Sequence, residues 1–214
     1  MRLASVNIGE ARAFKAKAGQ SGIVKLPSED PVRVTRNGLL GDTICDTENH
    51  GGVDQAVYVY GAPDYAWWSE TLGKELRPGT FGENLTVTDI DTASLQIGDR
   101  LHVGSVLLEV TAPRIPCVTL AARMEDPAFA KRFRQAERPG VYCRVLQEGH
   151  VQVGDEVTLR PYEGETVGAL ELFQDFFKPH RDEATLRRHL TAPIAVRDRV
   201  TKEAELQKLL QAHE

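Results

Sequence analysis

The amino-acid sequence predicts a mainly β protein of the α+β class, a β-barrel with helical insertions followed by a small three-helix domain. Three observations indicate this fold. Short β-branched segments separated by glycine, proline and aspartate dominate the first part of the chain, a turn motif recurs within that part, and helical periodicity follows it. We therefore expect a β-barrel domain over residues 1–163 and a three-helix domain over residues 164–214.

The expected strands are short and rich in β-branched residues. Residues 105–111 alternate, with Val106, Leu108 and Val110 on one face of a strand. Further strands are expected at residues 56–60, 85–87, 142–146 and 156–159.

A short motif that occurs twice in the chain supports a barrel. Residues 96–101 and 152–157 both read Gln, β-branched, Gly-Asp, charged, apolar. Gly-Asp at this place is typical of a turn that leads into a strand, because glycine accepts positive φ and aspartate can cap the turn. Several short strands with such turns favour a closed or nearly closed barrel.

Two helical insertions are expected between the strands. The first covers residues 63–72, with a proline in its first turn and a glycine after its end. The second covers residues 119–135 and is expected to break at Pro127, with Phe129 and Phe133 four residues apart on one face. Both apolar stripes indicate core packing more than a binding site.

Helical periodicity predicts three helices after residue 163, at residues 166–177, 182–190 and 201–212. Such a group is too small to be stable alone, so we expect it to pack on the barrel or on a partner.

Composition narrows the class of protein. Hydrophobic residues make up 41% and charged residues 27% of the chain, which is typical of a globular domain. The net charge of −5 argues against a nucleic-acid binder. No apolar run is long enough for a membrane span or a signal peptide, so we expect a cytoplasmic protein without membrane association.

The cysteines do not suggest disulfides. The chain has three, Cys45, Cys117 and Cys143, with no CxxC pair. A functional cysteine would therefore act as a thiolate. Cys45 is expected to be a loop thiol without a role.

Cys117 is the strongest candidate for such a role. It ends a loop that Pro113 and Pro116 stiffen after a predicted strand. Arg114 supplies nearby positive charge, which favours the thiolate. The alternative is a buried structural cysteine with Arg114 on the surface.

Two polar loops are further candidates. Gly51 and Gly52 follow His50, and paired glycines let the backbone approach a ligand or form an anion nest. Glu83 and Asn84 precede a strand and could bind a heterocycle or a phosphate. Turn formation alone also accounts for both loops.

A third candidate region lies at residues 138–144. After a turn, Tyr142 and Arg144 share one face of a strand, and Cys143 points to the core. Three basic residues could supply the positive surface that an anionic cofactor needs, although each is also explained as a solvated charge: Lys25, Arg138 and Arg144.

Taken in order, these elements resemble the MOSC family, and within it the bacterial YiiM-like branch. The resemblance covers essentially the whole chain, and its specificity comes from five motifs in sequence. They lie at residues 38–42, 50–57, 80–85, 113–117 and 138–145, and read GLLGD, HGGVDQAV, TFGENL, PRIPC and RPGVYCRV.

The resemblance implies a MOSC-type barrel that binds the molybdenum cofactor. Cys117 matches the metal-ligating, catalytic cysteine of the family, and a soft thiolate suits a metal that sulfurs already hold. The resemblance also implies cofactor contacts from Lys25, His50, Asn84, Arg114 and Tyr142.

The implied activity is reduction of N-hydroxylated compounds, such as hydroxylaminopurine-type bases. No GxGxxG fingerprint occurs, so an external flavoprotein supplied by NAD(P)H is the expected electron donor. The predicted C-terminal helices lack cysteine, which excludes an iron–sulfur module there. The alternative function is a non-catalytic carrier that holds sulfur or the cofactor on Cys117.

Overall fold

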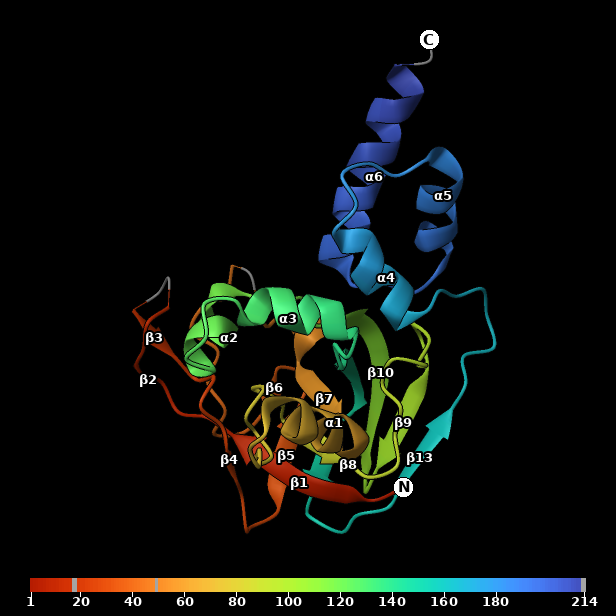
Figure 1. The fold of residues 1–214 in the computed structure, drawn as a ribbon. Coiled ribbons are helices and arrows are strands. Elements are labelled where there is room, and N and C mark those ends of the chain that lie inside the picture. The colour runs from red at the N-terminus through yellow and green to blue at the C-terminus, as the bar shows by residue number, and fades with distance from the viewer. Residues whose placement is uncertain (17–18, 49, 213–214) are drawn as a thin grey trace.

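A computed structural model describes residues 1–16, 19–48 and 50–212 of the chain. The fold is α+β, with one large mixed sheet, helices packed around it and three helices at the C-terminal end (Figure 1). Neighbouring strands are antiparallel except β7 and β8, which run parallel. The order across the eight-stranded sheet is β13 (Val157–Arg160), β9 (Arg100–Val103), β10 (Val106–Pro113), β11 (Val141–Gln147), β7 (Val57–Gly61), β8 (Leu85–Val87), β1 (Leu3–Ile8) and β4 (Leu26–Pro27).

The sheet does not close into the expected barrel. Two different segments pair with the outer edge of β1. Its last two residues pair with β4, and at its other end the Leu3 N–H donates to the Asp155 carbonyl at 2.9 Å. One isolated bridge, between Arg2 and Glu156, joins this edge to the segment before β13. Since neither contact extends into a full ladder, the described residues form a sheet whose two edges touch without closing.

Two smaller sheets accompany the large one. β5 (Val32–Thr35) lies between β12 (Gly149–Val151) and β6 (Gly38–Leu39), and β2 (Arg12–Ala13) pairs with β3 (Gln20–Ser21). All five of these strands are two to four residues long. These strands were not predicted, because a strand of two to four residues is too short to show a recognisable alternation of polar and apolar residues.

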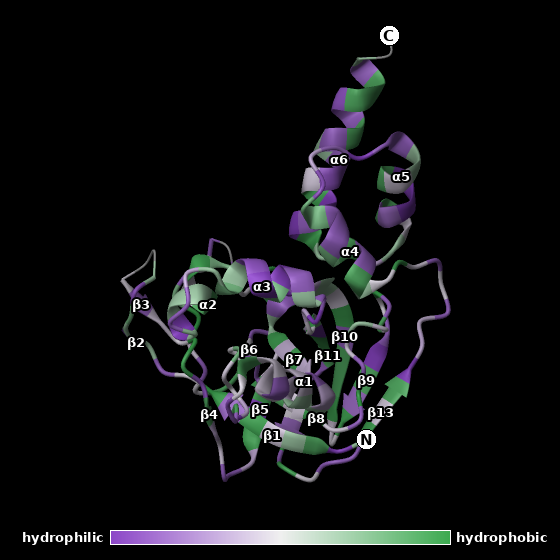
Figure 2. Cartoon of the chain, in the orientation of Figure 1, coloured by the Kyte–Doolittle hydropathy of each residue, from purple (hydrophilic) through white to green (hydrophobic). Residues whose placement is uncertain are grey.

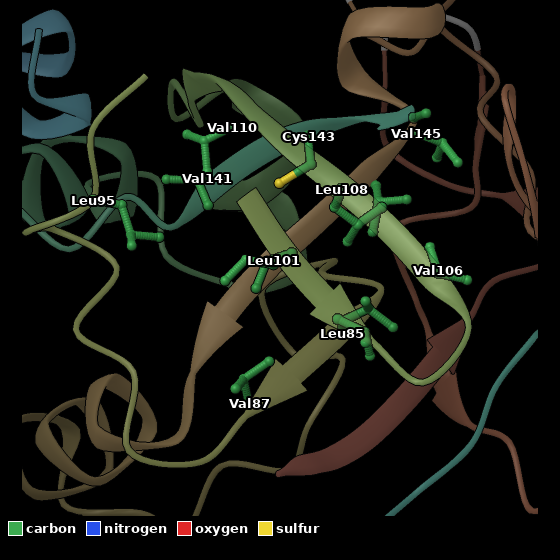
Figure 3. Close-up of a cluster of buried hydrophobic side chains, with 14 of the residues drawn as sticks. Leu85, Val87, Leu95, Leu101, Val106, Leu108, Val110, Val141, Cys143 and Val145 are labelled. Carbon is green, nitrogen blue, oxygen red and sulfur yellow. The ribbon is translucent and has the colours of Figure 1, made fainter. Parts of the chain in front are cut away.

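The first core lies against β10 and its neighbours. Val106, Leu108 and Val110 are at most 1% exposed, which confirms that their face of the strand belongs to the core, and Glu109 and Thr111 are buried as well. Figure 3 shows the three apolar side chains in one cluster with Cys143, which is 0% exposed, as expected. Burial of each such side chain contributes about 1.5–3 kcal/mol.

Both helical insertions are present. α1 (Ala62–Leu72) has a proline in its first turn and ends at Gly73, whose φ of 63° is a left-handed conformation that glycine accepts readily. The second insertion is divided at Pro127, as expected, into α2 (Val118–Arg123) and α3 (Phe129–Ala136).

The insertions cover a second, aromatic core. The Trp68 ring stacks on Phe133, with centroids 5.9 Å apart and planes inclined by 11°. Trp68 Nε1 donates to the Tyr60 hydroxyl at 2.9 Å. Phe81 and Phe129 complete the cluster, so the aromatic stripes are core, as expected.

Three helices follow the sheet: α4 (Ala169–Phe176), α5 (Glu183–Thr191) and α6 (Val196–Gln211). α6 projects away from the sheet and carries many hydrophilic residues (Figures 1 and 2). It begins at Val196, ahead of the expected start at residue 201. Within the described part of the chain, no helix combines the length and the apolar character that crossing a bilayer requires.

Candidate functional site

One cavity is lined by all six residues to which the family resemblance assigns a role. Together with the open solvent at its mouth, it encloses about 750 Å³ of space that protein atoms do not fill. Residues that bind one ligand must lie around one cavity, and these six residues do. Its lining includes Lys25, His50, Asn84, Arg114, Cys117 and Tyr142.

The end of β10 delivers Cys117 to this cavity. The strand ends at Pro113, and the chain then runs without regular structure to Cys117, the N-cap residue of α2. The Cys117 carbonyl accepts the Leu120 N–H at 3.1 Å. Cys117 is half-buried, so its sulfur is both held in place and accessible from the cavity.

The surroundings of Cys117 favour the thiolate. Burial by itself raises the pKa of this thiol, but a hydrogen bond with His50 and the positive charge of Arg114 outweigh it and lower the pKa to about 6. Cys143 behaves in the opposite way, because complete burial raises its pKa. The cavity therefore holds a thiolate at neutral pH.

We expect alkylation of Cys117 by iodoacetamide to depend on pH with a midpoint near the thiol pKa of about 6. Because only the thiolate reacts, the rate should rise from pH 5 and level off above pH 7. In Arg114→Gln the midpoint should move upward, toward the ordinary cysteine value. Mass spectrometry of the Cys117 peptide measures the rate, and Cys143 serves as the unreactive control. A midpoint above pH 8 in the unchanged protein would contradict the prediction.

Arg114 is a buried guanidinium with an unused hydrogen-bond donor. It is 4% exposed, and its Nη1 has no partner among the described residues. The guanidinium lies 5.9 Å from the centroid of the Tyr58 ring and 5.4 Å from that of Phe133. A buried donor without a partner is costly, so this position suits an anionic ligand group.

Lys25 and Asn84 share one carboxylate partner, Asp42, which was not among the predicted site residues. Asp42 forms an ion pair with Lys25, and its Oδ1 also accepts the Gly9 N–H at 2.8 Å. Its Oδ2 accepts a hydrogen bond from Asn84 Nδ2 at 2.9 Å, and Asn84 Oδ1 accepts the Tyr58 N–H at 3.1 Å. The charge of Lys25 is therefore balanced within the protein, which leaves Arg114 better placed for an anion.

Two of the three basic residues proposed for a positive surface do not reach the cavity. Arg138 Nη1 lies 2.7 Å from Asp64 Oδ1, and Arg144 Nε lies 3.0 Å from Asp54 Oδ1. Neither arginine lines the cavity. Of the two interpretations left open, a positive surface for a cofactor therefore does not apply to Arg138 and Arg144, because each has a carboxylate partner from a distant part of the chain.

Other lining residues were missed. Gln55 and Tyr58 line the cavity, and Gln55 Oε1 is buried without a partner in the described structure. Cys45, expected to be a loop thiol without a role, also faces this space. A turn in which His50 N–H donates to the Asp46 carbonyl at 3.0 Å brings that loop to the wall. Only the glycine pair beside it signalled such a turn.

Within residues 1–16, 19–48 and 50–212, no group of three or more His, Cys, Asp and Glu side chains is arranged to hold a metal ion.

The chain matches one protein family and is similar in sequence to several known proteins. The pattern described as the MOSC domain matches residues 46–158. Bacillus subtilis YflK is 36% identical over 157 residues, which cover 72% of this chain and 71% of that protein. A protein of Gibberella moniliformis named "Reductase" is 35% identical over 165 residues, covering 72% of this chain but only 29% of its own length.

The fold is also similar to that of a solved structure. The crystal structure of YiiM from Geobacillus stearothermophilus superimposes with a TM-score of 0.80 at 25% identity, covering 96% of this chain and 98% of that one. The MOSC pattern, the YflK similarity and this superposition agree with one another. This chain is therefore a member of the MOSC domain family.

Proposed function

We propose that this protein is an oxidoreductase that binds the molybdenum cofactor and reduces N-hydroxylated compounds, with Cys117 as a ligand of the metal. The observation that carries the proposal is the Cys117 thiolate, with a pKa of about 6, beside the unpartnered guanidinium of Arg114. MOSC domains are associated with this cofactor, and a fungal relative is named a reductase.

The residues of the cavity fit the cofactor chemically. A thiolate is a soft donor and suits a metal that is otherwise bound by sulfur. Arg114 Nη1 offers a buried donor to an anionic group such as a phosphate.

Each residue then has a distinct part in the proposed site. Cys117 ligates the metal. The hydrogen bond between His50 and Cys117 keeps the thiol ionised. Arg114 binds the anionic end of the cofactor. Lys25 and Asn84, joined through Asp42, shape the wall next to it, and Tyr142 lines the cavity near Arg114.

When bound, the cofactor supplies a metal centre that exchanges two electrons and accepts oxygen. The net reaction converts R–NHOH, two electrons and two protons into R–NH₂ and water. The chain has no nucleotide-binding GxGxxG fingerprint, so an external flavoprotein that oxidises NAD(P)H is proposed as the electron donor.

The test uses the full chain loaded with molybdenum cofactor, an NADPH-dependent flavoprotein reductase and an N-hydroxylated purine. We expect the aminopurine to form in proportion to molybdenum content, measured by chromatography and elemental analysis. Metal-replete protein that is inert toward every N–OH compound would contradict the proposal. A persulfide on Cys117 without turnover would favour the carrier function instead.

A further inference from the structure

The first turn of α6 is held by a residue from beside the cavity. The N-cap residue of α6, Ala195, has no side chain that can accept a hydrogen bond. Instead Asp54 Oδ2 accepts the Val196 N–H at 2.7 Å, across 142 residues of sequence. N–H groups at a helix N-terminus lack partners within the helix, and a carboxylate there is also favoured by the helix dipole. Asp54 thus caps α6 from outside it.

Arg144 strengthens the same junction. Its Nε lies 3.0 Å from Asp54 Oδ1, and its Nη2 donates to the carbonyls of Pro193 and Ile194 at 3.1 and 3.3 Å. The main chain of Asp54 is fixed as well, because the Thr111 hydroxyl donates to its carbonyl at 2.5 Å. The start of α6 is therefore tied to β10 and β11 as well as to Asp54.

The elements that hold α6 also carry the cavity wall. Asp54 belongs to the short 3₁₀-helix η1 (Val53–Gln55), whose last residue lines the cavity. β11 places Tyr142 in the cavity two residues before Arg144. β10 leads directly into the loop of Arg114 and Cys117. A displacement of the start of α6 would therefore act directly on elements that carry cavity-lining residues.

We propose that Asp54 is a positioning residue that couples the C-terminal helices to the cavity: its cap on α6 holds η1, and with it Gln55, in place. A displacement of α6 that breaks this cap would release Gln55 from the wall. The coupling does not depend on which ligand the cavity takes, so it stands or falls separately from the proposed reductase activity.

The test compares two cap deletions by hydrogen–deuterium exchange of the full chain. In Asp54→Ala we expect amides in residues 50–57 to exchange about tenfold faster, which corresponds to the usual loss from removing an N-cap. Asp182→Ala is the matched control, because Asp182 caps α5 through the Thr185 N–H at 2.7 Å and has no contact with the cavity. It should accelerate residues 182–190 and leave residues 50–57 unchanged.

A second readout is alkylation of Cys117 by iodoacetamide, which we expect to become at least threefold faster in Asp54→Ala and to stay constant in Asp182→Ala. Asp54→Asn keeps an oxygen for the cap, so it should restore slow exchange to within about threefold of the unchanged protein. Equal acceleration of residues 50–57 by both alanine variants, or no rescue by asparagine, would overturn the proposal.

The unchanged protein provides a further test that needs no variant to fold. The Gln55 N–H is bonded to the Gly52 carbonyl at 3.0 Å, and the Val196 N–H to Asp54. If the two segments open together, both amides should exchange with the same opening free energy and the same dependence on denaturant. Clearly different opening free energies would show that η1 and α6 move independently, and would exclude the coupling.

Discussion

Replacing Cys117 with serine is expected to lower the molybdenum content of the purified protein by about 100-fold and to abolish reduction of N-hydroxylated bases. Serine keeps the size of the side chain but removes the soft, ionised sulfur, and its hydroxyl does not ionise near neutral pH. Loss of an outer-shell partner of a metal ligand already costs about 10–100-fold in affinity, so loss of the proposed ligand itself should cost at least as much.

Cys45→Ser is the matched control for this experiment. Cys45 lines the same cavity, so the variant makes the same chemical change at a position that we do not propose as a ligand. Elemental analysis and activity should both match the unchanged protein. Equal metal content in Cys117→Ser and the unchanged protein would remove Cys117 from the metal site, and a loss in Cys45→Ser alone would reassign that role.

The second large effect is expected on stability. Trp68→Ala should lower the free energy of unfolding by about 3–5 kcal/mol. Trp68 is 1% exposed, stacks on Phe133 and donates to the Tyr60 hydroxyl, so truncation leaves a cavity and removes a buried hydrogen bond. Its ring centroid is 5.7 Å from that of Phe81, which lines the candidate site, so the loss should also weaken the cavity wall.

The neighbouring tryptophan supplies the control. Trp67 is half-buried, and its ring lies 4.9 Å from the Arg138 guanidinium. Trp67→Ala removes the same volume from the same helix but should cost only about 1 kcal/mol. Guanidinium chloride unfolding followed by far-UV circular dichroism measures both variants without relying on tryptophan fluorescence. Similar losses in the two variants would mean that the aromatic cluster does not stabilise the fold as described.

Much of the local structure could be predicted from the sequence because it depends on near neighbours. The alternation of Val106, Leu108 and Val110 identified β10, and Pro127 marked the break between α2 and α3. β1 was missed, although it is one of the longer strands of the large sheet and pairs with both β8 and β4. Its residues, LASVNI, mix polar and apolar types without strict alternation, since both faces are largely covered.

The candidate site was predictable to a similar degree. Cys117 and Arg114 stand three residues apart in a proline-stiffened loop, so their proximity is a local property. Asp42 could not be recognised in this way. Its partners Lys25 and Asn84 lie far from it in sequence, and only the fold brings the three together.

By itself, the sequence determined the strands with a clear apolar pattern, such as β10, the proline and glycine breaks, the family resemblance and the loop that presents Cys117. These properties follow from backbone preferences and from residues a few positions apart. Only the tertiary structure decided that the sheet stays open, that Arg144 turns away from the cavity and that α6 begins at Val196. Each of these depends on a hydrogen bond or ion pair between distant segments, and local periodicity carries no information about such partners.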